Sequence, residues 1–167
     1  MIRLEIPWRY IRYVRFFLST RQTVVNINGV ASKMFTLNEG LPQGSAISPL
    51  LFLIFINDID VDLHPDTLVS LFADDTAVWT QRGVDQEHSQ RIMQEEIDKI
   101  CEWARKWKMK LNEGKTKTVA ISTKPSDTDW KPTLQLNGKS VDTVPSHKFL
   151  GVQIDNKLRF PEHIEET

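Results

Sequence analysis

Two adjacent carboxylates stand directly behind an apolar run, in the sequence Leu71-Phe72-Ala73-Asp74-Asp75. Such neighbours repel each other unless water or a cation screens them. Mg²⁺ takes few protein carboxylates and completes its shell with water and phosphate oxygens, and two such ions can activate a hydroxyl and stabilise a leaving pyrophosphate. An isolated Asp-Asp pair is more often an ordinary turn. Here the apolar runs on both sides and a glycine-rich loop upstream favour the metal site.

That upstream loop reads Gly40-Leu41-Pro42-Gln43-Gly44-Ser45. Its two glycines allow a ligand to approach the backbone closely, and the Gln43 side chain can both donate and accept hydrogen bonds. The helix predicted next offers free N–H groups that favour phosphate. An ordinary loop before a capped helix explains the segment equally well. Because the loop has no Walker-type lysine, a P-loop nucleotide triphosphatase is excluded.

The elements that position these residues follow from periodicity and turn signals. Helices are predicted over residues 7–19, 48–56 and about 85–107, the second with Ser48 as N-cap and apolar almost all round, as in a buried helix. The predicted strands and their hairpin turns are 23–27, 30–36, 67–73, 76–80, 117–122, 134–136 and 147–155, with turns at Asn28-Gly29 and Asn137-Gly138. This order of elements is that of an α+β domain.

The composition is that of one globular domain: 167 residues, 40% hydrophobic and 26% charged. A net charge of −1 argues against a free-standing nucleic-acid binder, although residues 1–57 are basic. The single cysteine, Cys101, excludes an internal disulfide, and it is expected in the core together with Trp103 and Trp107. No signal peptide is apparent, and the longest apolar stretch is too short to span a bilayer. We therefore expect an intracellular protein of the nucleus or cytoplasm.

Four ordered motifs resemble those of reverse transcriptases from non-long-terminal-repeat (non-LTR, LINE) retrotransposons, most of all the insect jockey-like group. Residues 40–52 with Asn57-Asp58 are similar to the motif that contacts template and nucleotide, and residues 71–76 are similar to the metal-binding box. Residues 107–116 resemble the next palm motif, and residues 147–152 resemble the primer grip. Further positions that fit the family are 21–32, Asp155, Leu158, Phe160, His163 and Ile164.

The resemblance implies a right-hand polymerase palm, an antiparallel sheet with helices packed on one face, truncated at both ends. Residues 1–167 would run from just after the first metal-binding strand to the start of the thumb. The implied activity is that of an RNA-directed DNA polymerase, a nucleotidyltransferase of a transposable element. It would use Mg²⁺ or Mn²⁺, an RNA template, a DNA primer and dNTPs, with no membrane partner and an oligomeric state left open.

The family also implies roles for single residues. Asp74 would bind the catalytic metals with support from Asp75. Lys115 would be the general acid for pyrophosphate, although a lysine in a polar turn explains it equally well. Gly151 also fits a strand glycine that relieves crowding. The remaining roles are substrate binding by Pro42, Gln43, Gly44, Phe72 and Ala73, and a primer grip formed by Phe149, Leu150 and Gly151.

One family feature is missing, because no aspartate occurs before Asp58. The family carries its first metal-binding aspartate on a strand before the hairpin, so we expect this chain alone to be inactive. An alternative is a non-catalytic remnant that binds RNA or a protein through Arg9, Arg12 and Arg15, although such a pattern is more often a solvated helix face. An intron-encoded maturase is a third reading. No histidine has a partner at zinc-ligand spacing.

Overall fold

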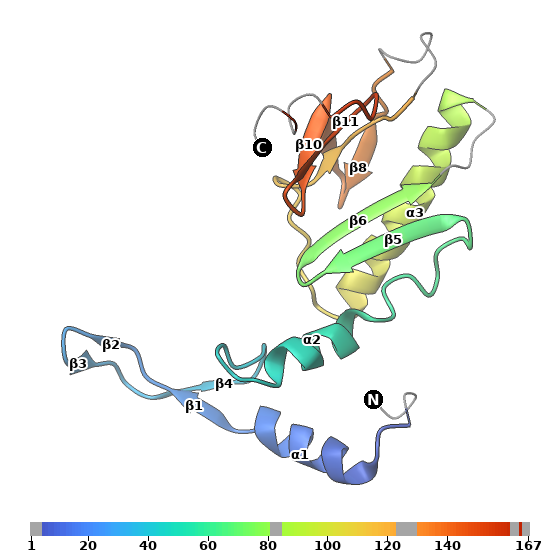
Figure 1. Ribbon diagram of the computed structural model, residues 1–167. Helices are drawn as coiled ribbons and strands as arrows, with labels where there is room; N and C mark the ends of the chain where they lie inside the picture. The colour runs from blue at the N-terminus through green and yellow to red at the C-terminus, as the bar shows by residue number, and fades with distance from the viewer. Residues whose placement is uncertain (1–4, 81–84, 123–129, 161–163, 165–167) are drawn as a thin grey trace. The chain divides into compact units, whose positions relative to one another are not determined.

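The computed structural model describes residues 5–80, 85–122, 130–160 and 164 of the chain (Figure 1). His163, one of the positions that fit the family, lies outside them. The chain forms two compact units, Met1–Asn57 and Asp58–Thr167. Among the described residues, no helix is both long enough and apolar enough to cross a membrane.

The first unit begins with helix α1 (Trp8–Leu18), close to its predicted bounds. Pro7, expected at the first helical position, is the N-cap residue instead, with φ −53° and ψ 137°. The predicted apolar face is confirmed, since Ile11, Val14 and Leu18 are half-buried while most other side chains of α1 are exposed. Amphipathic spacing therefore determines which side of α1 packs against the chain.

A long hairpin follows α1. Asn28 and Gly29 at its tip both have positive φ, 51° and 83°, as a two-residue type I′ turn requires. The predicted turn is confirmed, but each predicted strand is interrupted at Val25 and Ser32. There the Ser32 hydroxyl accepts from the Val25 N–H at 2.9 Å, so a side chain replaces a ladder partner. The antiparallel pairs are β1 (Arg21–Thr23) with β4 (Phe35–Leu37), and β2 (Asn26–Ile27) with β3 (Val30–Ala31).

Helix α2 (Ser48–Ile56) closes the first unit and departs from the predicted burial. Leu51 and Ile56 are buried, but Leu50 and Leu53 are 59% and 51% exposed. A helix that is apolar on every side buries the side that the chain covers and leaves the rest in solvent. The expectation that α2 is buried all round is therefore wrong for the described chain.

The second unit contains the longest helix, α3 (Gln86–Lys106), within one residue of its predicted bounds. Asp85 caps its start by accepting from the His88 N–H at 2.8 Å. Arg105 and Lys106 in the last turn complement the negative end of the helix dipole. Both ends of α3 thus follow from local sequence signals.

One face of α3 is buried, as its periodicity predicted. Cys101 and Trp103 are 5% and 7% exposed, which confirms their packing role. Trp107 is 44% exposed and its prediction is wrong, because it lies past the helix at the C-cap position. Its ring centroid is 6.4 Å from that of Trp103. The buried residues of α3 are Ile92, Glu96, Ile100, Cys101, Trp103 and Ala104.

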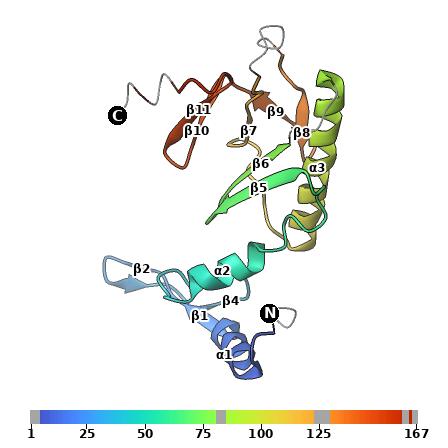
Figure 2. The same ribbon diagram turned by 45° about the vertical axis from the view of Figure 1, so that its right-hand side comes forward.

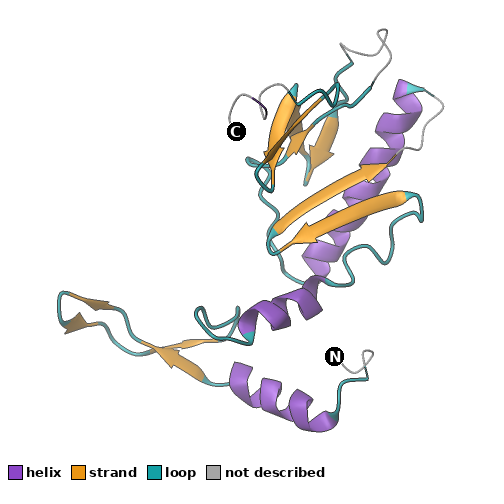
Figure 3. Cartoon of the chain, in the orientation of Figure 1, coloured by secondary structure: helices purple, strands orange, loops and turns teal. Residues whose placement is uncertain are grey.

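Within the described part of the second unit, seven strands accompany α3 in small sheets, which Figure 3 colours orange. Strands β5 and β6 form one hairpin, β10 and β11 form another, and the order of the third sheet is β7-β9-β8. All pairs are antiparallel except β7 with β9, and α3 lies along β8 and beside β6 (Figures 1 and 2). The strands are β5 (Thr67–Phe72), β6 (Asp75–Thr80), β7 (Lys117–Thr118), β8 (Leu134–Leu136), β9 (Lys139–Thr143), β10 (Ser146–Phe149) and β11 (Val152–Asp155).

The core between α3 and the three-stranded sheet is apolar, and polar side chains cover the sheet edge. Gln94 accepts from the N–H of Gln135 at 2.8 Å and donates to its carbonyl at 3.0 Å. Gln90 accepts from the Thr133 N–H at 2.8 Å. These amides take the place of a further strand beside β8. The core residues are Cys101, Leu134, Leu136 and Val141, flanked by Met93, Ile97 and Leu111.

Two strand predictions need correction. The strand expected over 117–122 is only the two residues of β7. The strand expected over 147–155 is a hairpin, since Leu150 and Gly151 have φ of 50° and 84° and form a further type I′ turn. Gly151 is accordingly a turn glycine rather than a strand glycine. The mixed α+β class is confirmed, with small and mostly antiparallel sheets in place of one continuous sheet.

Candidate active site

The two carboxylates lie at the tip of the β5–β6 hairpin. Phe72 pairs with Asp75, so the turn consists of Ala73 and Asp74 alone, and Asp75 is the first residue of β6. Ala73 has a φ of 50°, in the left-handed region that favours glycine. A positive φ at the first turn residue is typical of type II′ hairpin turns. The hairpin holds this alanine in a strained conformation beside the aspartates, and such strain is often found at functional sites.

The strand register places Asp75 on an open face of the hairpin. Residues directly opposite each other in an antiparallel pair share a face, so Asp75 and Phe72 lie on the same face as the Leu68–Trp79 pair. The large apolar side chains there, Leu68, Phe72 and Trp79, are 43–62% exposed. The other face carries the buried Thr67. One face is therefore covered, and the face of Asp75 is accessible.

Both aspartates are exposed, and neither makes a hydrogen bond or ion pair within the described part of the chain. Their oxygens are hard donors, the type that Mg²⁺ and Mn²⁺ prefer. Across residues 5–80, 85–122 and 130–160, no three His, Cys, Asp or Glu side chains gather closely enough to hold a metal. Asp74 and Asp75 thus suit a shared hard cation, which would complete its shell from other sources.

The glycine-rich loop belongs to the first unit, and its backbone follows the glycines. Gly40 and Gly44 have φ of 75° and 82°, and beyond the adjacent residues no described atom lies within 4 Å of where a Cβ would stand. These glycines are required by backbone conformation rather than by crowding. Gln43 and Gly44 are exposed, and Pro42 is half-buried.

Ser48 ties this loop to α2 in a way that differs from the prediction. It is the first helical residue, with Ile47 at the N-cap. Its hydroxyl donates to the Pro42 carbonyl at 2.7 Å and accepts no helix N–H. The Ser45 hydroxyl accepts from the Ile47 N–H at 3.4 Å. The predicted N-cap is therefore wrong, because the loop brings its own carbonyl within reach of Ser48.

Lys115 lies in a turn that one asparagine organises. The Asn112 carbonyl accepts from the N–H groups of Lys115 and Thr116 at 3.2 and 3.1 Å, and its side chain accepts again from Lys115 at 3.2 Å. The Lys115 side chain is exposed, and no hydrogen bond or ion pair joins it to Asp74 or Asp75 among the described residues. The role of Asn112 was not predicted from the sequence, although an asparagine before Glu-Gly is a common turn signal.

The residues of the predicted primer grip lie at the tip of the β10–β11 hairpin. Phe149 is half-buried and pairs with Val152, while Leu150 is 45% exposed in the turn. Gly151 supplies the second positive φ of this turn. The three residues therefore form a projecting hairpin tip in the second unit, as do Phe72, Ala73 and the two aspartates.

Helix α3 holds the segment that leads into β5. The buried Glu96 accepts from the His64 N–H at 2.9 Å and from the Lys99 ammonium at 2.9 Å. Seven residues on, the Trp103 indole donates to Asp58 at 2.9 Å. Burial raises the pKa of Glu96, but the bonds from Lys99 and His64 outweigh it and hold the pKa below its ordinary value. We call the contacts of Glu96 with His64 and of Trp103 with Asp58 the clamp. It was not predicted from the sequence.

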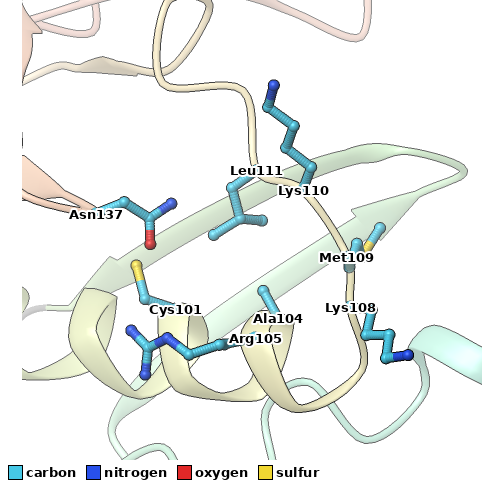
Figure 4. A pocket seen from close by; sticks show the side chains of 8 residues that line it. All are labelled: Cys101, Ala104, Arg105, Lys108, Met109, Lys110, Leu111 and Asn137. Atoms are coloured by element: carbon cyan, nitrogen blue, oxygen red, sulfur yellow. The ribbon is translucent and has the colours of Figure 1, made fainter.

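A surface pocket of the second unit lies between the end of α3 and the β8–β9 turn (Figure 4). The ammonium groups of Lys108 and Lys110 extend away from Cys101 in this view. Arg105 lies where positive charge complements the helix dipole. No predicted site residue lines the pocket, and we assign it no part in the candidate site. Its lining consists of Cys101, Ala104, Arg105, Lys108, Met109, Lys110, Leu111 and Asn137.

Comparison with known proteins adds an independent finding. A family model described as reverse transcriptase (RNA-dependent DNA polymerase) matches residues 2–154. The RNA-directed DNA polymerase from mobile element jockey of Drosophila melanogaster is 32% identical over 169 residues, covering 97% of this chain and 18% of that protein.

Two further relatives are also proteins of transposable elements. The probable RNA-directed DNA polymerase from transposon X-element of Drosophila melanogaster is 27% identical over 168 residues, covering 99% of this chain and 18% of that protein. A retrovirus-related Pol polyprotein from type-1 retrotransposable element R1 2 of Nasonia vitripennis is 26% identical over 129 residues, covering 75% of this chain and 31% of that protein. This chain thus spans less than a third of each of these three relatives.

Proposed function

The chain belongs to the reverse transcriptase (RNA-dependent DNA polymerase) family, and from this membership we propose that it acts as the palm of an RNA-directed DNA polymerase of a non-LTR retrotransposon. The activity is nucleotidyl transfer from dNTPs to a DNA primer on an RNA template. The observation that carries the proposal is the hairpin tip, where Asp74 and Asp75 stand exposed behind a strained Ala73.

The palm architecture is supported by the layering of the second unit. Helix α3 runs beside the β5–β6 hairpin (Figures 1 and 2), whose opposite face carries Asp75 and the exposed Phe72. A sheet with helices on one face and an accessible acidic face is what the polymerase palm requires. In this proposal the open face meets the primer terminus, with Phe72 and Ala73 beneath it.

Asp74 and Asp75 would hold Mg²⁺ or Mn²⁺, which supplies Lewis-acid activation and neutralises developing phosphate charge. The chain's own contribution is to hold both carboxylates at one rigid turn. The two-residue loop fixes the backbone of Asp74 at the tip, and the strand ladder fixes Asp75 on the open face. Lys115 would donate a proton to the leaving pyrophosphate, its ammonium unpaired among the described residues.

The other predicted residues have positioning roles in this proposal. Gln43 and Gly44 are exposed, and with Pro42 they would contact the template base and the incoming nucleotide. The β10–β11 tip would support the primer backbone through Phe149 and the exposed Leu150. The positive φ values of Leu150 and Gly151 make this tip a tight turn with little freedom.

Metal binding tests the proposal without requiring activity. Titration with Mn²⁺, followed by the electron paramagnetic resonance signal of free Mn²⁺, should show binding to the wild-type chain. The variant Asp74→Asn/Asp75→Asn should lose it. The matched control is Asp60→Asn/Asp62→Asn, which removes two exposed carboxylates of the same unit. Equal Mn²⁺ binding by both double variants would contradict the assignment of the metal site.

A further inference from the structure

Helix α1 carries an exposed face that combines arginines with aromatic rings. At 100° per residue its members fall within an arc of about 120°, whose centre is about 130° around the helix from that of the half-buried Ile11, Val14 and Leu18. Successive arginines are about 4.5 Å apart along the helix axis. We call this surface the basic-aromatic face; it consists of Trp8, Arg9, Arg12, Arg15 and Phe16.

The charge of this face is not neutralised by the described chain. Helix α1 contains no acidic residue, and Arg12 and Arg15 make no ion pair or hydrogen bond among the described residues. Arg9 lies over the Tyr10 ring, 4.8 Å from its centroid. Arg21, by contrast, donates to the carbonyls of Leu18 and Glu39 and has a structural role.

The aromatic side chains argue against a merely solvated face. Trp8 is 63% exposed and Phe16 is 81% exposed, beside the arginines. A helix face whose only role is to meet water has no need of large rings, and exposed aromatic surface next to arginine is typical of interaction sites. Tyr13 and Phe17 stack at 6.3 Å with an interplanar angle of 13°, which extends the aromatic surface around the helix.

We infer that the basic-aromatic face binds single-stranded nucleic acid, with Arg12 and Arg15 on phosphates and the rings of Trp8 and Phe16 stacked on bases. This inference rests on the proposed function for its class of partner. Stacking on aromatic rings combined with backbone contacts from cations is the usual means of binding single strands without sequence preference. The arginines satisfy the electrostatic requirement and the exposed rings satisfy the stacking requirement on the same helix.

A membrane surface fits this face less well. Interfacial helices separate an apolar face, which enters the lipid, from a charged face. In α1 the purely aliphatic face, with Ile11 and Val14, is half-buried against the protein. The exposed face mixes Trp8 and Phe16 with guanidinium groups, and the exposed rings next to it, Tyr10 and Tyr13, carry polar hydroxyls.

Fluorescence anisotropy with labelled 20-nucleotide oligo(U) and oligo(dT), in EDTA and from 50 to 300 mM KCl, tests the inference. Arg12→Ala/Arg15→Ala should reduce the slope of log K against log[KCl] by about 1.4, and weaken binding about 25-fold at 0.1 M KCl. Phe16→Ala should weaken it roughly tenfold at every salt concentration. Alanine favours helix, so α1 is expected to persist, and circular dichroism checks this.

The control Arg91→Ala/Lys106→Ala removes the same charge from exposed positions of α3 and should leave affinity and slope nearly unchanged. The assay contains EDTA and no Mn²⁺, so binding by this face does not require the metal site, and failure of the metal site and failure of this face give different results. Equal weakening by the two double variants would overturn the inference. Binding of the wild type to anionic vesicles but not to oligonucleotides would overturn it as well.

Discussion

Replacing Glu96 by glutamine tests whether α3 positions the strand that leads to the aspartates. Glu96 is 1% exposed, and its carboxylate accepts from the His64 N–H and from Lys99. Because its pKa is lowered despite burial, the ionised form is on balance favoured in the folded state. Glutamine keeps the shape and one acceptor oxygen but loses the charge.

The expected cost follows from the two bonds. A hydrogen bond to a charged group contributes roughly 1 kcal/mol more than a neutral one, and the bond from the His64 N–H to the buried Glu96 carboxylate loses this difference. The Lys99 side chain is 37% exposed, so solvent screening reduces its share to about 0.5 kcal/mol. Glu96→Gln should therefore lower the free energy of unfolding by about 1.5 kcal/mol at pH 7. Glu96→Ala also leaves the His64 N–H unpaired and should lower it by about 3 kcal/mol.

The assay is urea unfolding followed by tryptophan fluorescence, since Trp103 is buried on the same helix. A lowered carboxyl pKa contributes stability above the ordinary glutamate value, about 4.3, and loses it as pH falls through the folded value. The difference between wild type and Glu96→Gln should thus narrow from pH 7 to pH 3. Glu102→Gln, at an exposed position of α3, is the matched control. If Glu96→Gln unfolds at the same urea concentration as wild type at pH 7, the clamp has no energetic role.

Three further predictions concern the aspartate hairpin, its catalytic competence and the end of β11. Ala73→Gly should raise the free energy of unfolding by up to about 1 kcal/mol, because it removes the strain of a positive φ. Ala77→Gly, within β6, should lower the free energy of unfolding, and urea unfolding compares the two variants. The chain alone should not extend a primer on an RNA template, and a Mg²⁺- or Mn²⁺-dependent extension abolished by Asp74→Asn would refute this. Burial raises the pKa of Asp155, but hydrogen bonds from the N–H groups of Phe160, Lys157 and Arg159 outweigh burial and hold this pKa below its usual range. Asp155→Asn should therefore destabilise the turn over residues 155–160 near neutral pH and not at acid pH. NMR spectra of the wild type and the variant, recorded over a pH titration, measure this difference.

Local signals explain which elements could be predicted from the sequence. Asn28-Gly29 and Asn137-Gly138 are turns because both residue types tolerate positive φ, and the structure confirms both. Leu150-Gly151 forms the same type of turn without an asparagine, so the sequence predicted one continuous strand over residues 147–155. Leucine disfavours a φ of 50°, and pairing of the flanking strands stabilises it there.

Contacts that are distant in sequence explain what could not be predicted. Glu96 stands beside Glu95 in a charged stretch of α3, where a solvated position is the ordinary expectation. Its partner, the His64 N–H, is 32 residues away and has no side-chain signature. The bond from Trp103 to Asp58 spans 45 residues and is equally invisible to local patterns.

The candidate site therefore depends on two kinds of interaction. The adjacency of Asp74, Asp75 and Phe72 comes from one two-residue turn, which is why residue types and spacing identified it. The direction in which that hairpin projects depends on the segment before β5, which Glu96 and Trp103 of α3 hold. Substitutions in the clamp should alter the placement of the carboxylates while leaving the carboxylates themselves intact. A weakened Mn²⁺ affinity in Glu96→Gln, with the hairpin ladder still protected from hydrogen exchange, would show this separation of roles.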